Sequence, residues 1–321
     1  MIAYHASQEQ FAPSRLLKLA QAAERAGFDA IHSSDHFHPW SERQGQSGFT
    51  FSWIAAALQA TNLPCSMVCA PGQRFHPAIV AQAIATLGEM FPGRYSVELG
   101  SGEALNESIT ATPWPAKNIR NERLRECADV IRKLLRGEKV TYHGHINVKD
   151  ARLYSVPEIT PKLIGAAISK ETSGWCGEWA DGLLTTAGEM EEVLEKKKAF
   201  EANGGAGKDV VAQFSFSFAD TKEAAVHGAW HQWRSNLVDP GKLAGLHTPE
   251  QFDEITKDIT HEEVAEKIKV FTDVSEIFEI AYSYLDQGIS MVTLHNVNTN
   301  QEEFVEACAK YLAVKKRKKA Y

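Results

Sequence analysis

The chain has 321 residues, of which 44% are hydrophobic and 23% charged, and its formal net charge is −7. This composition is typical of a globular protein that buries a large core, and it argues against a disordered chain. The acidic balance opposes binding to nucleic acid, whose phosphates require a basic surface. The one basic run, residues 315–319, follows a helical pattern, and we interpret it as a solvated, fraying helix end.

The cysteines and the apolar segments bear on the cell compartment. The five cysteines have neither the spacing of a disulfide framework nor that of a zinc site, and Cys65 and Cys69 fall within an apolar, strand-like run. We therefore predict reduced core thiols in a cytoplasmic protein. No apolar leader opens the chain, and no apolar stretch of about 18 residues occurs in it. We expect a protein that is neither secreted nor membrane-spanning.

Short β-rich runs alternate with helical patterns along the whole chain. The first helical pattern has Pro13 in its first turn and Gly27 just after its end, which are typical helix boundaries. Eight runs, each followed by a helix, predict the α/β class and a closed (β/α)8 TIM barrel that forms a single domain over residues 1–321. The predicted strands are residues 2–5, 29–34, 64–70, 94–100, 162–167, 181–186, 210–218 and 289–296.

Two insertions interrupt this pattern. Residues 137–156, after the fourth strand, alternate with period two and predict a hairpin-like excursion. Residues 232–260, after the seventh strand, are polar, broken by proline and glycine, and only weakly helical. Long insertions of this kind usually cover or flank a functional site.

The segment SSDHFHPW follows the second strand. Because TIM barrels form their active sites at the C-terminal ends of the strands, Asp35, His36, His38 and Trp40 are expected at the barrel mouth. His36 is a candidate acid or base, since imidazole titrates near neutrality. A histidine merely packed at a strand end explains the motif about as well, because adjacent strand residues face opposite sides.

Two other loops reach the same mouth. LGSGEALNE, residues 99–107, combines flexible glycines with Glu103, although its spacing matches neither a Walker nor a Rossmann motif. Together, His36 and Glu103 favour an acid/base site. GAAISKET, residues 165–172, places Ser169 at a helix start, as an anion site or as an ordinary N-cap. Metal and hydrolase motifs are absent, so we expect no metal site.

At these residues the chain resembles the luciferase-like family of flavin- and deazaflavin-dependent oxidoreductases, and within it the glucose-6-phosphate dehydrogenase branch that uses coenzyme F420. The similarity is most specific in residues 4–13, 34–40, 75–87 and 100–107. It implies a homodimer with a flavin ring at each barrel mouth. It also implies that His36 is the base on a substrate hydroxyl, that Trp40 supports the reacting centre, and that Glu103 is the acid beside the reduced ring.

The resemblance also implies two sets of binding residues. The cofactor positions are Asp35, Met67, Val68, Asn106, Ala167, Ile168 and Ser169, with a non-proline cis peptide bond in the segment of Met67 and Val68. The substrate-pocket positions are Ser7, Thr186, Glu189 and Lys267.

The chain departs from the branch in both sets. Where the dehydrogenases hold a sugar phosphate with two lysines and an arginine, this chain has Glu189, Phe252 and Lys267, so a non-phosphorylated small-molecule substrate is expected. Ile168 and Ser169 replace a pair of glycines in the cofactor-tail segment. That segment is more similar to a subgroup from organisms thought not to make the deazaflavin, which leaves FMN and coenzyme F420 both open.

Three functions remain at this point. The first is a flavin- or deazaflavin-dependent oxidoreductase that transfers hydride on a small organic substrate, and the second is an FMN-dependent monooxygenase supplied by a partner flavin reductase. The third is a non-catalytic flavin-binding barrel. His36 and Glu103 argue against the third, since binding alone requires neither.

Overall fold

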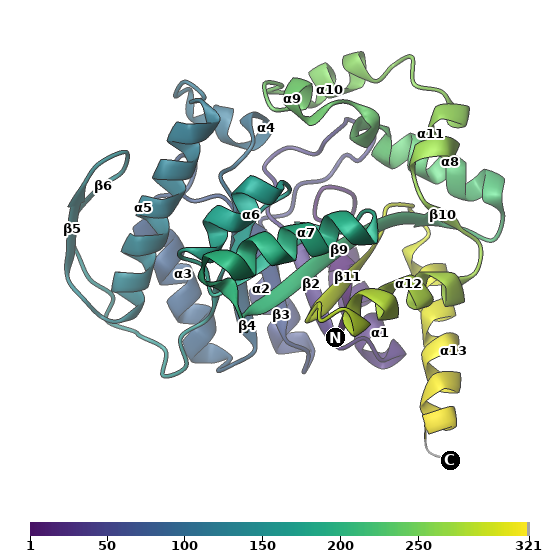
Figure 1. Cartoon of the computed structure of the whole chain (residues 1–321), viewed down its shortest axis with the longest axis horizontal. Coiled ribbons are helices and arrows are strands. Elements are labelled where there is room, and N and C mark those ends of the chain that lie inside the picture. Colours follow the sequence, from purple (N-terminus) through teal and green to yellow (C-terminus); the bar gives the residue numbers. More distant parts are fainter. Residues whose placement is uncertain (320–321) are drawn as a thin grey trace.

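Eight parallel strands form a closed barrel in the computed structural model, which describes the backbone of residues 1–319 and the side chains of residues 1–315 (Figure 1). The strand order is β9-β11-β1-β2-β3-β4-β7-β8, and pairing of β8 with β9 closes the barrel. All eight predicted strands are confirmed, with ends that differ by one or two residues. The strands are β1 (Ile2–Ala6), β2 (Ala30–Ser34), β3 (Cys65–Cys69), β4 (Tyr95–Leu99), β7 (Leu163–Ala166), β8 (Gly182–Thr186), β9 (Asp209–Phe218) and β11 (Met291–Asn296).

Helices cover the outside of the barrel. The first, α1 (Pro13–Ala26), has the predicted ends: Pro13 stands in its first turn, and Gly27 takes the left-handed conformation with φ 98°. The other long helices are α2 (Thr50–Ala60), α3 (Pro77–Met90), α5 (Lys117–Leu135), α6 (Lys170–Gly177), α7 (Met190–Phe200), α8 (Lys222–Trp233), α12 (Val274–Asp286) and α13 (Gln301–Lys319). The backbone of the basic run 315–319 is helical, but its side chains from residue 316 on lie outside the described part.

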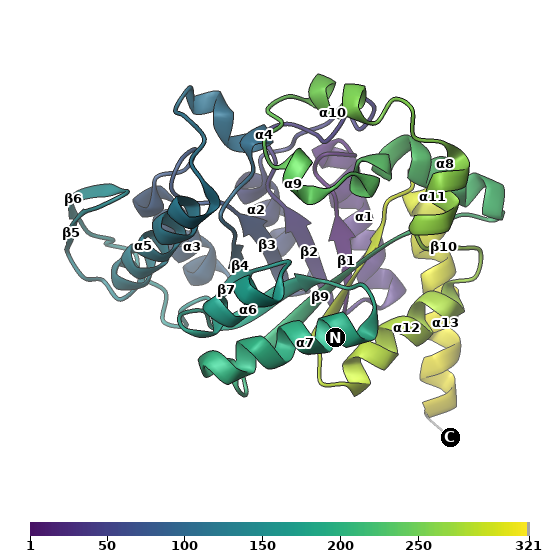
Figure 2. The same cartoon turned by 45° about the horizontal axis from the view of Figure 1, so that its top comes forward.

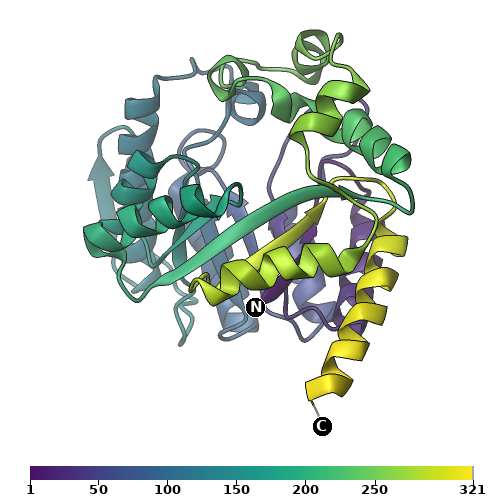
Figure 3. The ribbon, with the colours of Figure 1, turned by 45° about the vertical axis from the view of Figure 1, so that its right-hand side comes forward.

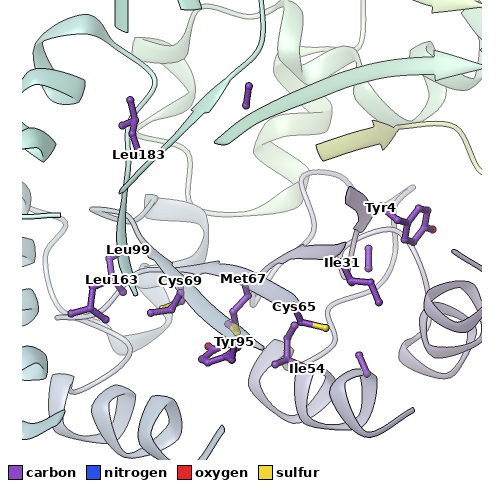
Figure 4. Close-up of a cluster of buried hydrophobic side chains, with 14 of the residues drawn as sticks. Tyr4, Ile31, Ile54, Cys65, Met67, Cys69, Tyr95, Leu99, Leu163 and Leu183 are labelled. Carbon is purple, nitrogen blue, oxygen red and sulfur yellow. The ribbon is translucent and has the colours of Figure 1, made fainter. Parts of the chain in front are cut away.

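The main core lies between the strands and these helices. Outward-facing side chains such as Tyr4, Ile31, Met67 and Leu163 pack there, together with Ile54 of α2 (Figure 4). All five cysteines are buried, as predicted. A smaller apolar layer fills the lower part of the barrel interior and comprises Ala3, Ala30, Ile164, Leu184, Val211 and Met291.

The first insertion is the predicted hairpin, β5 (Val140–His143) paired antiparallel with β6 (Asn147–Ala151), beside α5. The long strand β9 extends past the barrel and adds the two-residue strand β10 (Val270–Phe271) at its far end (Figure 3).

The second insertion is more helical than its sequence indicates. It contains α9 (Pro240–Leu243) and α10 (Pro249–Ile255) and is followed by α11 (His261–Lys267). Prolines in the first turns of α9 and α10, and the Asp239 carboxylate that accepts from Gly241 N at 2.9 Å, allow such short helices to form.

The helices α9 and α10 lie at the end of the barrel to which the strands point (Figure 2). The insertion contacts the loop after β2 through an ion pair between Arg43 Nη2 and Asp253 Oδ1 at 2.6 Å. His247 Nδ1 lies 2.5 Å from Ser108 Oγ, on the loop after β4. The insertion therefore borders the barrel mouth, as predicted.

Among the described residues, no helix has the length and apolar character needed to cross a membrane.

Candidate active site

His36 and Glu103 both lie at the barrel mouth, because β2 and β4 end on the same side and only β3 separates them. Glu103 is accessible at the open mouth, yet the protein atoms around it displace enough water to raise the pKa of its carboxyl. A charge on His36 opposes this rise, while Glu9 and Glu107 add to it. The two side chains predicted to handle protons are therefore electrostatically coupled.

Asn106 orients the ring of His36. Its Oδ1 accepts hydrogen bonds from Phe37 N at 2.8 Å and His38 N at 3.1 Å. The amide nitrogen Nδ2 must then be the atom that faces His36 Nδ1, at 3.1 Å. In the neutral ring Nδ1 is thus an acceptor, and the ring proton lies on Nε2. Trp40 packs beside the ring, with 5.4 Å between centroids.

Glu9 is a site residue that the sequence analysis missed. Its Oε1 lies 4.0 Å from His36 Nε2, and the two side chains are only 3% and 11% exposed. Ser34 Oγ approaches both carboxylate oxygens, at 3.4 and 3.5 Å. Glu9 follows the C-terminal end of β1, so the reasoning that selected His36 after β2 would have found it.

Asp35 lies below the mouth rather than in it. Its side chain is completely buried, and Oδ2 pairs with Arg74 Nη2 at 2.6 Å. Its Oδ1 accepts from Thr50 N, at the start of α2. Arg74 also contacts Glu107 through Nε at 3.4 Å. Asp35 thus holds the loop and α2 together, and both of its oxygens are engaged within the protein.

Met67 and Val68, both expected at the cofactor, point to opposite sides of β3. The side chain of Met67 faces the helices and is 0% exposed, so it cannot reach the mouth, whereas Val68 faces the barrel interior. No peptide bond in residues 1–319 is cis, so the expected cis bond is corrected to trans. Met67 and Val68 both pair in register with β2 on one side and β4 on the other. Regular pairing of this kind uses trans peptide bonds, which non-proline residues strongly favour.

The segment after β7 reaches the mouth through Ile168, which is 62% exposed. Ala167 is buried in the core, while Ser169 caps α6 by accepting from Thr172 N at 3.3 Å. The N-cap interpretation of Ser169 is therefore confirmed.

The upper barrel interior presents apolar groups beside a glycine, the kind of surface on which a flat ring can pack. Val68 and Ala166 are partly buried there, and a Cβ added to Gly100 would lie 3.9 Å from both side chains and reduce the space between them. Ser7 Oγ is buried and has no hydrogen-bond partner among the described residues. Val68, Ala166 and Gly100 could thus hold the ring face of a flavin or deazaflavin, with Ser7 as a free polar contact.

The expected substrate-pocket residues lie in different surroundings. Glu189 and Lys267 line one cavity of about 570 Å³, where Lys269 Nζ lies 3.6 Å from Glu189 Oε1. Thr186 is exposed at the end of β8. Phe252 is 1% exposed and packs edge-on against Trp40, with 5.4 Å between the ring centroids. This position therefore carries an apolar contact in place of a cation.

Among the described residues, no three His, Cys, Asp or Glu side chains are arranged to hold a metal ion.

Comparison with known proteins gives the family. The Luciferase-like monooxygenase family model matches residues 2–277. An F420-dependent glucose-6-phosphate dehydrogenase from Beutenbergia cavernae is 32% identical, over 96% of this chain and 95% of its own. The corresponding enzyme from Mycobacterium leprae is also 32% identical, over 99% and 98%.

Solved structures with a similar fold include members of the same kind of enzyme. An F420-dependent secondary alcohol dehydrogenase in complex with an F420-acetone adduct is 28% identical, with a TM-score of 0.88 over 97% of both chains. The coenzyme F420-dependent tetrahydromethanopterin reductase from Methanopyrus kandleri, at 19% identity and a TM-score of 0.75 over 96% of both chains, shares the fold. With its closed TIM barrel and this near-complete coverage, the chain belongs to the luciferase-like monooxygenase family.

Proposed function

We propose that this protein is an F420-dependent dehydrogenase that removes hydride from a small, non-phosphorylated alcohol. The observation that carries the proposal is the grouping at the barrel mouth of His36, hydrogen-bonded to Asn106, with the Glu9 carboxylate 4.0 Å from His36 Nε2 and with Glu103 electrostatically coupled to His36. The similarity to relatives named as F420-dependent dehydrogenases supports the cofactor. When bound, coenzyme F420 would supply the acceptor for the hydride.

His36 and Glu9 provide the two functions that a hydroxyl group needs. Because Nδ1 of His36 accepts from Asn106, its Nε2–H is available to donate a hydrogen bond to the substrate oxygen. The Glu9 carboxylate, 4.0 Å from that nitrogen, has free lone pairs. We assign uptake of the hydroxyl proton to the Glu9 carboxylate, because neither nitrogen of His36 is free to accept it in this tautomer. The base function expected of His36 thus passes to Glu9, while His36 binds the substrate oxygen.

Glu103 is suited to the opposite task. The raised pKa of its carboxyl, which results chiefly from loss of hydration, makes it hold a proton more readily than a carboxyl in water. A proton donor is needed wherever negative charge grows on the group that receives the hydride. Glu103 therefore supplies a proton while Glu9 takes one up.

The expected substrate lacks a phosphate. Glu189, whose carboxylate lies 3.6 Å from Lys269 Nζ, offers a dianion no cation, and Phe252 presents no charge. Lys267 is the single cation among the three positions that hold phosphate by resemblance. The secondary alcohol dehydrogenase, with its acetone adduct, supports an alcohol as the substrate class.

The test is reduction of coenzyme F420, followed by its absorbance, with secondary alcohols, free sugars and glucose 6-phosphate compared at equal concentration. We expect secondary alcohols to be turned over best. His36→Ala and Glu9→Gln should each lower kcat/KM by about 10²- to 10⁴-fold. Lys18→Ala, on the outer helix α1, is the control. Preference for glucose 6-phosphate would refute the substrate class, and unchanged turnover in both variants would refute the site.

FMN remains a second candidate cofactor because of the exposed Ile168 and the capping role of Ser169, in the segment that departs from the F420-dependent branch. Titration of the apo-protein with FMN and with coenzyme F420 separates the two. Tight FMN binding with substrate-dependent oxygen consumption would replace our proposal by a monooxygenase that needs a flavin reductase. A homodimer in the cytoplasm stays a prediction, and light scattering measures the oligomeric state.

A further inference from the structure

A row of titratable side chains crosses the barrel interior below the mouth. TIM barrels fill such inward positions mainly with branched apolar residues. Here His5 of β1, His32 of β2 and Glu98 of β4 occupy them, and their exposed fractions are 3%, 0% and 0%. His5 Nδ1 lies 2.8 Å from His32 Nδ1, and His32 Nε2 lies 3.9 Å from Glu98 Oε2. The three groups form one row, in which His5 and His32 are hydrogen-bonded and Glu98 lies just beyond hydrogen-bond distance of His32.

The proton positions in this row depend on one another. Two imidazole nitrogens 2.8 Å apart share one N–H, so one donates and the other accepts. If His32 Nδ1 donates to His5, then His32 Nε2 is an acceptor and suits a protonated Glu98. If His5 donates, His32 Nε2 carries the proton and suits an ionised Glu98. The protonation state of Glu98 therefore selects the tautomer of His32.

Four polar atoms of this row are unpaired among the described residues, which is unusual for a protein interior. His5 Nε2, His32 Nε2 and both carboxyl oxygens of Glu98 have no hydrogen-bond partner within residues 1–319. Burial raises the pKa of Glu98 to about 8 and lowers the pKa of His32 to about 3. Unpaired buried polar groups are costly, and a protonated Glu98 with neutral histidines is the least costly state near neutral pH.

The titratable groups beside this row do not extend it. The ring of His295 packs against that of His5 at a tilt of 46°, with 4.1 Å between centroids. Its Nδ1 faces Ser215 Oγ at 3.2 Å, and its Nε2 faces Gln10 Oε1 at 3.4 Å. His295 thus has partners on both nitrogens and does not continue the row. On the outer faces of β3 and β4, burial keeps Cys69 and Tyr95 neutral by raising the pKa of each.

The row of His5, His32 and Glu98 comes from the same three strands as the acid/base groups of the mouth. β1 leads from His5 to Glu9, β2 from His32 to His36, and β4 from Glu98 to Glu103. The pKa of His5 is lowered by burial first, then by charges on His295, His32 and His36. The interior row is therefore electrostatically coupled to His36.

We propose that Glu98, His32 and His5 form a proton-relay triad inside the barrel. A proton passes from Glu98 Oε2 to His32 Nε2 while the proton on His32 Nδ1 passes to His5 Nδ1. This exchange leaves a Glu98 carboxylate and a His5 imidazolium, and only O–H and N–H bonds break and form. The transfer requires the 3.9 Å between His32 Nε2 and Glu98 Oε2 to shorten to hydrogen-bond distance. The triad holds an exchangeable proton beneath the strand ends that carry the mouth residues.

Infrared spectroscopy of the apo-protein tests the proton on Glu98. We expect the carbonyl band of a protonated carboxyl group at pH 7, its loss in Glu98→Gln, and its disappearance from the wild type above about pH 8. Glu122→Gln is the matched control, because Glu122 Oε2 pairs with His145 Nε2 at 3.0 Å on the surface. That variant should keep the band. A spectrum in which Glu98→Gln removes no band would overturn the proposal.

Nitrogen NMR of histidine-labelled apo-protein tests the relay itself. In the wild type the proton of His32 should move from Nδ1 to Nε2 as Glu98 ionises. In Glu98→Gln, whose amide can donate to Nε2, His32 should keep the Nδ1 proton at every pH. A wild-type His32 that never changes tautomer would overturn the relay. Neither experiment uses a cofactor or substrate, so its failure is distinct from failure of the dehydrogenase proposal.

A second variant covers the case in which Glu98→Gln does not fold. His32→Asn keeps a polar group near the position of Nδ1 but removes Nε2. The carboxyl band of Glu98 should then shift in frequency, because the imidazole nitrogen that lies 3.9 Å from it is gone. An unshifted band would show that His32 does not receive the proton of Glu98.

Discussion

Replacement of Glu98 by glutamine should change how stability depends on pH. Glu98 is fully buried, and burial raises its pKa from 4.5 to about 8. Because the folded state binds this proton more tightly than the unfolded chain, the stabilisation is complete below about pH 4.5 and is lost as the pH rises through about 8. At about 1.4 kcal/mol per pKa unit, the full effect is about 5 kcal/mol.

The assay is urea unfolding of the wild type and Glu98→Gln at a series of pH values. Glutamine cannot ionise, so only the wild type loses this stabilisation as the pH rises. The difference in free energy of unfolding, variant minus wild type, should therefore rise by about 4 kcal/mol between about pH 5 and about pH 8 and then level off. The remaining buried histidines titrate in both proteins and largely cancel. Glu122→Gln, at an exposed position, is the matched control in the same titration. A flat difference for Glu98→Gln would refute our assignment of a neutral, buried carboxyl.

Further predictions concern packing and charge. Arg74→Met leaves two buried carboxylates without their cation and should lower the free energy of unfolding, measured by urea titration, by about 3–5 kcal/mol. Arg15→Met breaks an exposed ion pair, whose side chains are 38% and 56% exposed, and should lower it by only about 0–1 kcal/mol. Gly228→Ala would place a Cβ 2.2 Å from Asn298 Cγ and should lower stability by about 1–3 kcal/mol. Gly245→Ala, where no described atom would lie within 4 Å of the new Cβ, should stay within about 0.5 kcal/mol. Equal losses within either pair would contradict the reasoning from burial.

The barrel could be predicted from sequence because its signals are local. Each strand is a short β-rich run followed by a helical pattern, and Pro13 and Gly27 mark helix ends through their own backbone preferences. The hairpin insertion is local as well. The helices α9 and α10 of the second insertion were underestimated, because prolines and glycines that indicate a loop also serve as first-turn and capping residues.

The candidate site was predicted only in part. His36 and Glu103 were found because both follow strand ends, and barrel closure brings such ends together. The partners that give His36 its proton position were not found: Asn106 is 70 positions away along the chain, and Glu9 is on a different strand. Asp35 was expected in the mouth, but Arg74, 39 positions away, holds it below.

Sequence by itself thus determined the number and order of the strands and which loops gather at one end of the barrel. Only the tertiary structure decided which face of each strand points inward, since both faces of a parallel barrel strand are buried and alternation cannot tell them apart. That choice turns Met67 outward and Val68 inward. It also lines up His5, His32 and Glu98 in the interior, where removal from water sets the protonation state of each group.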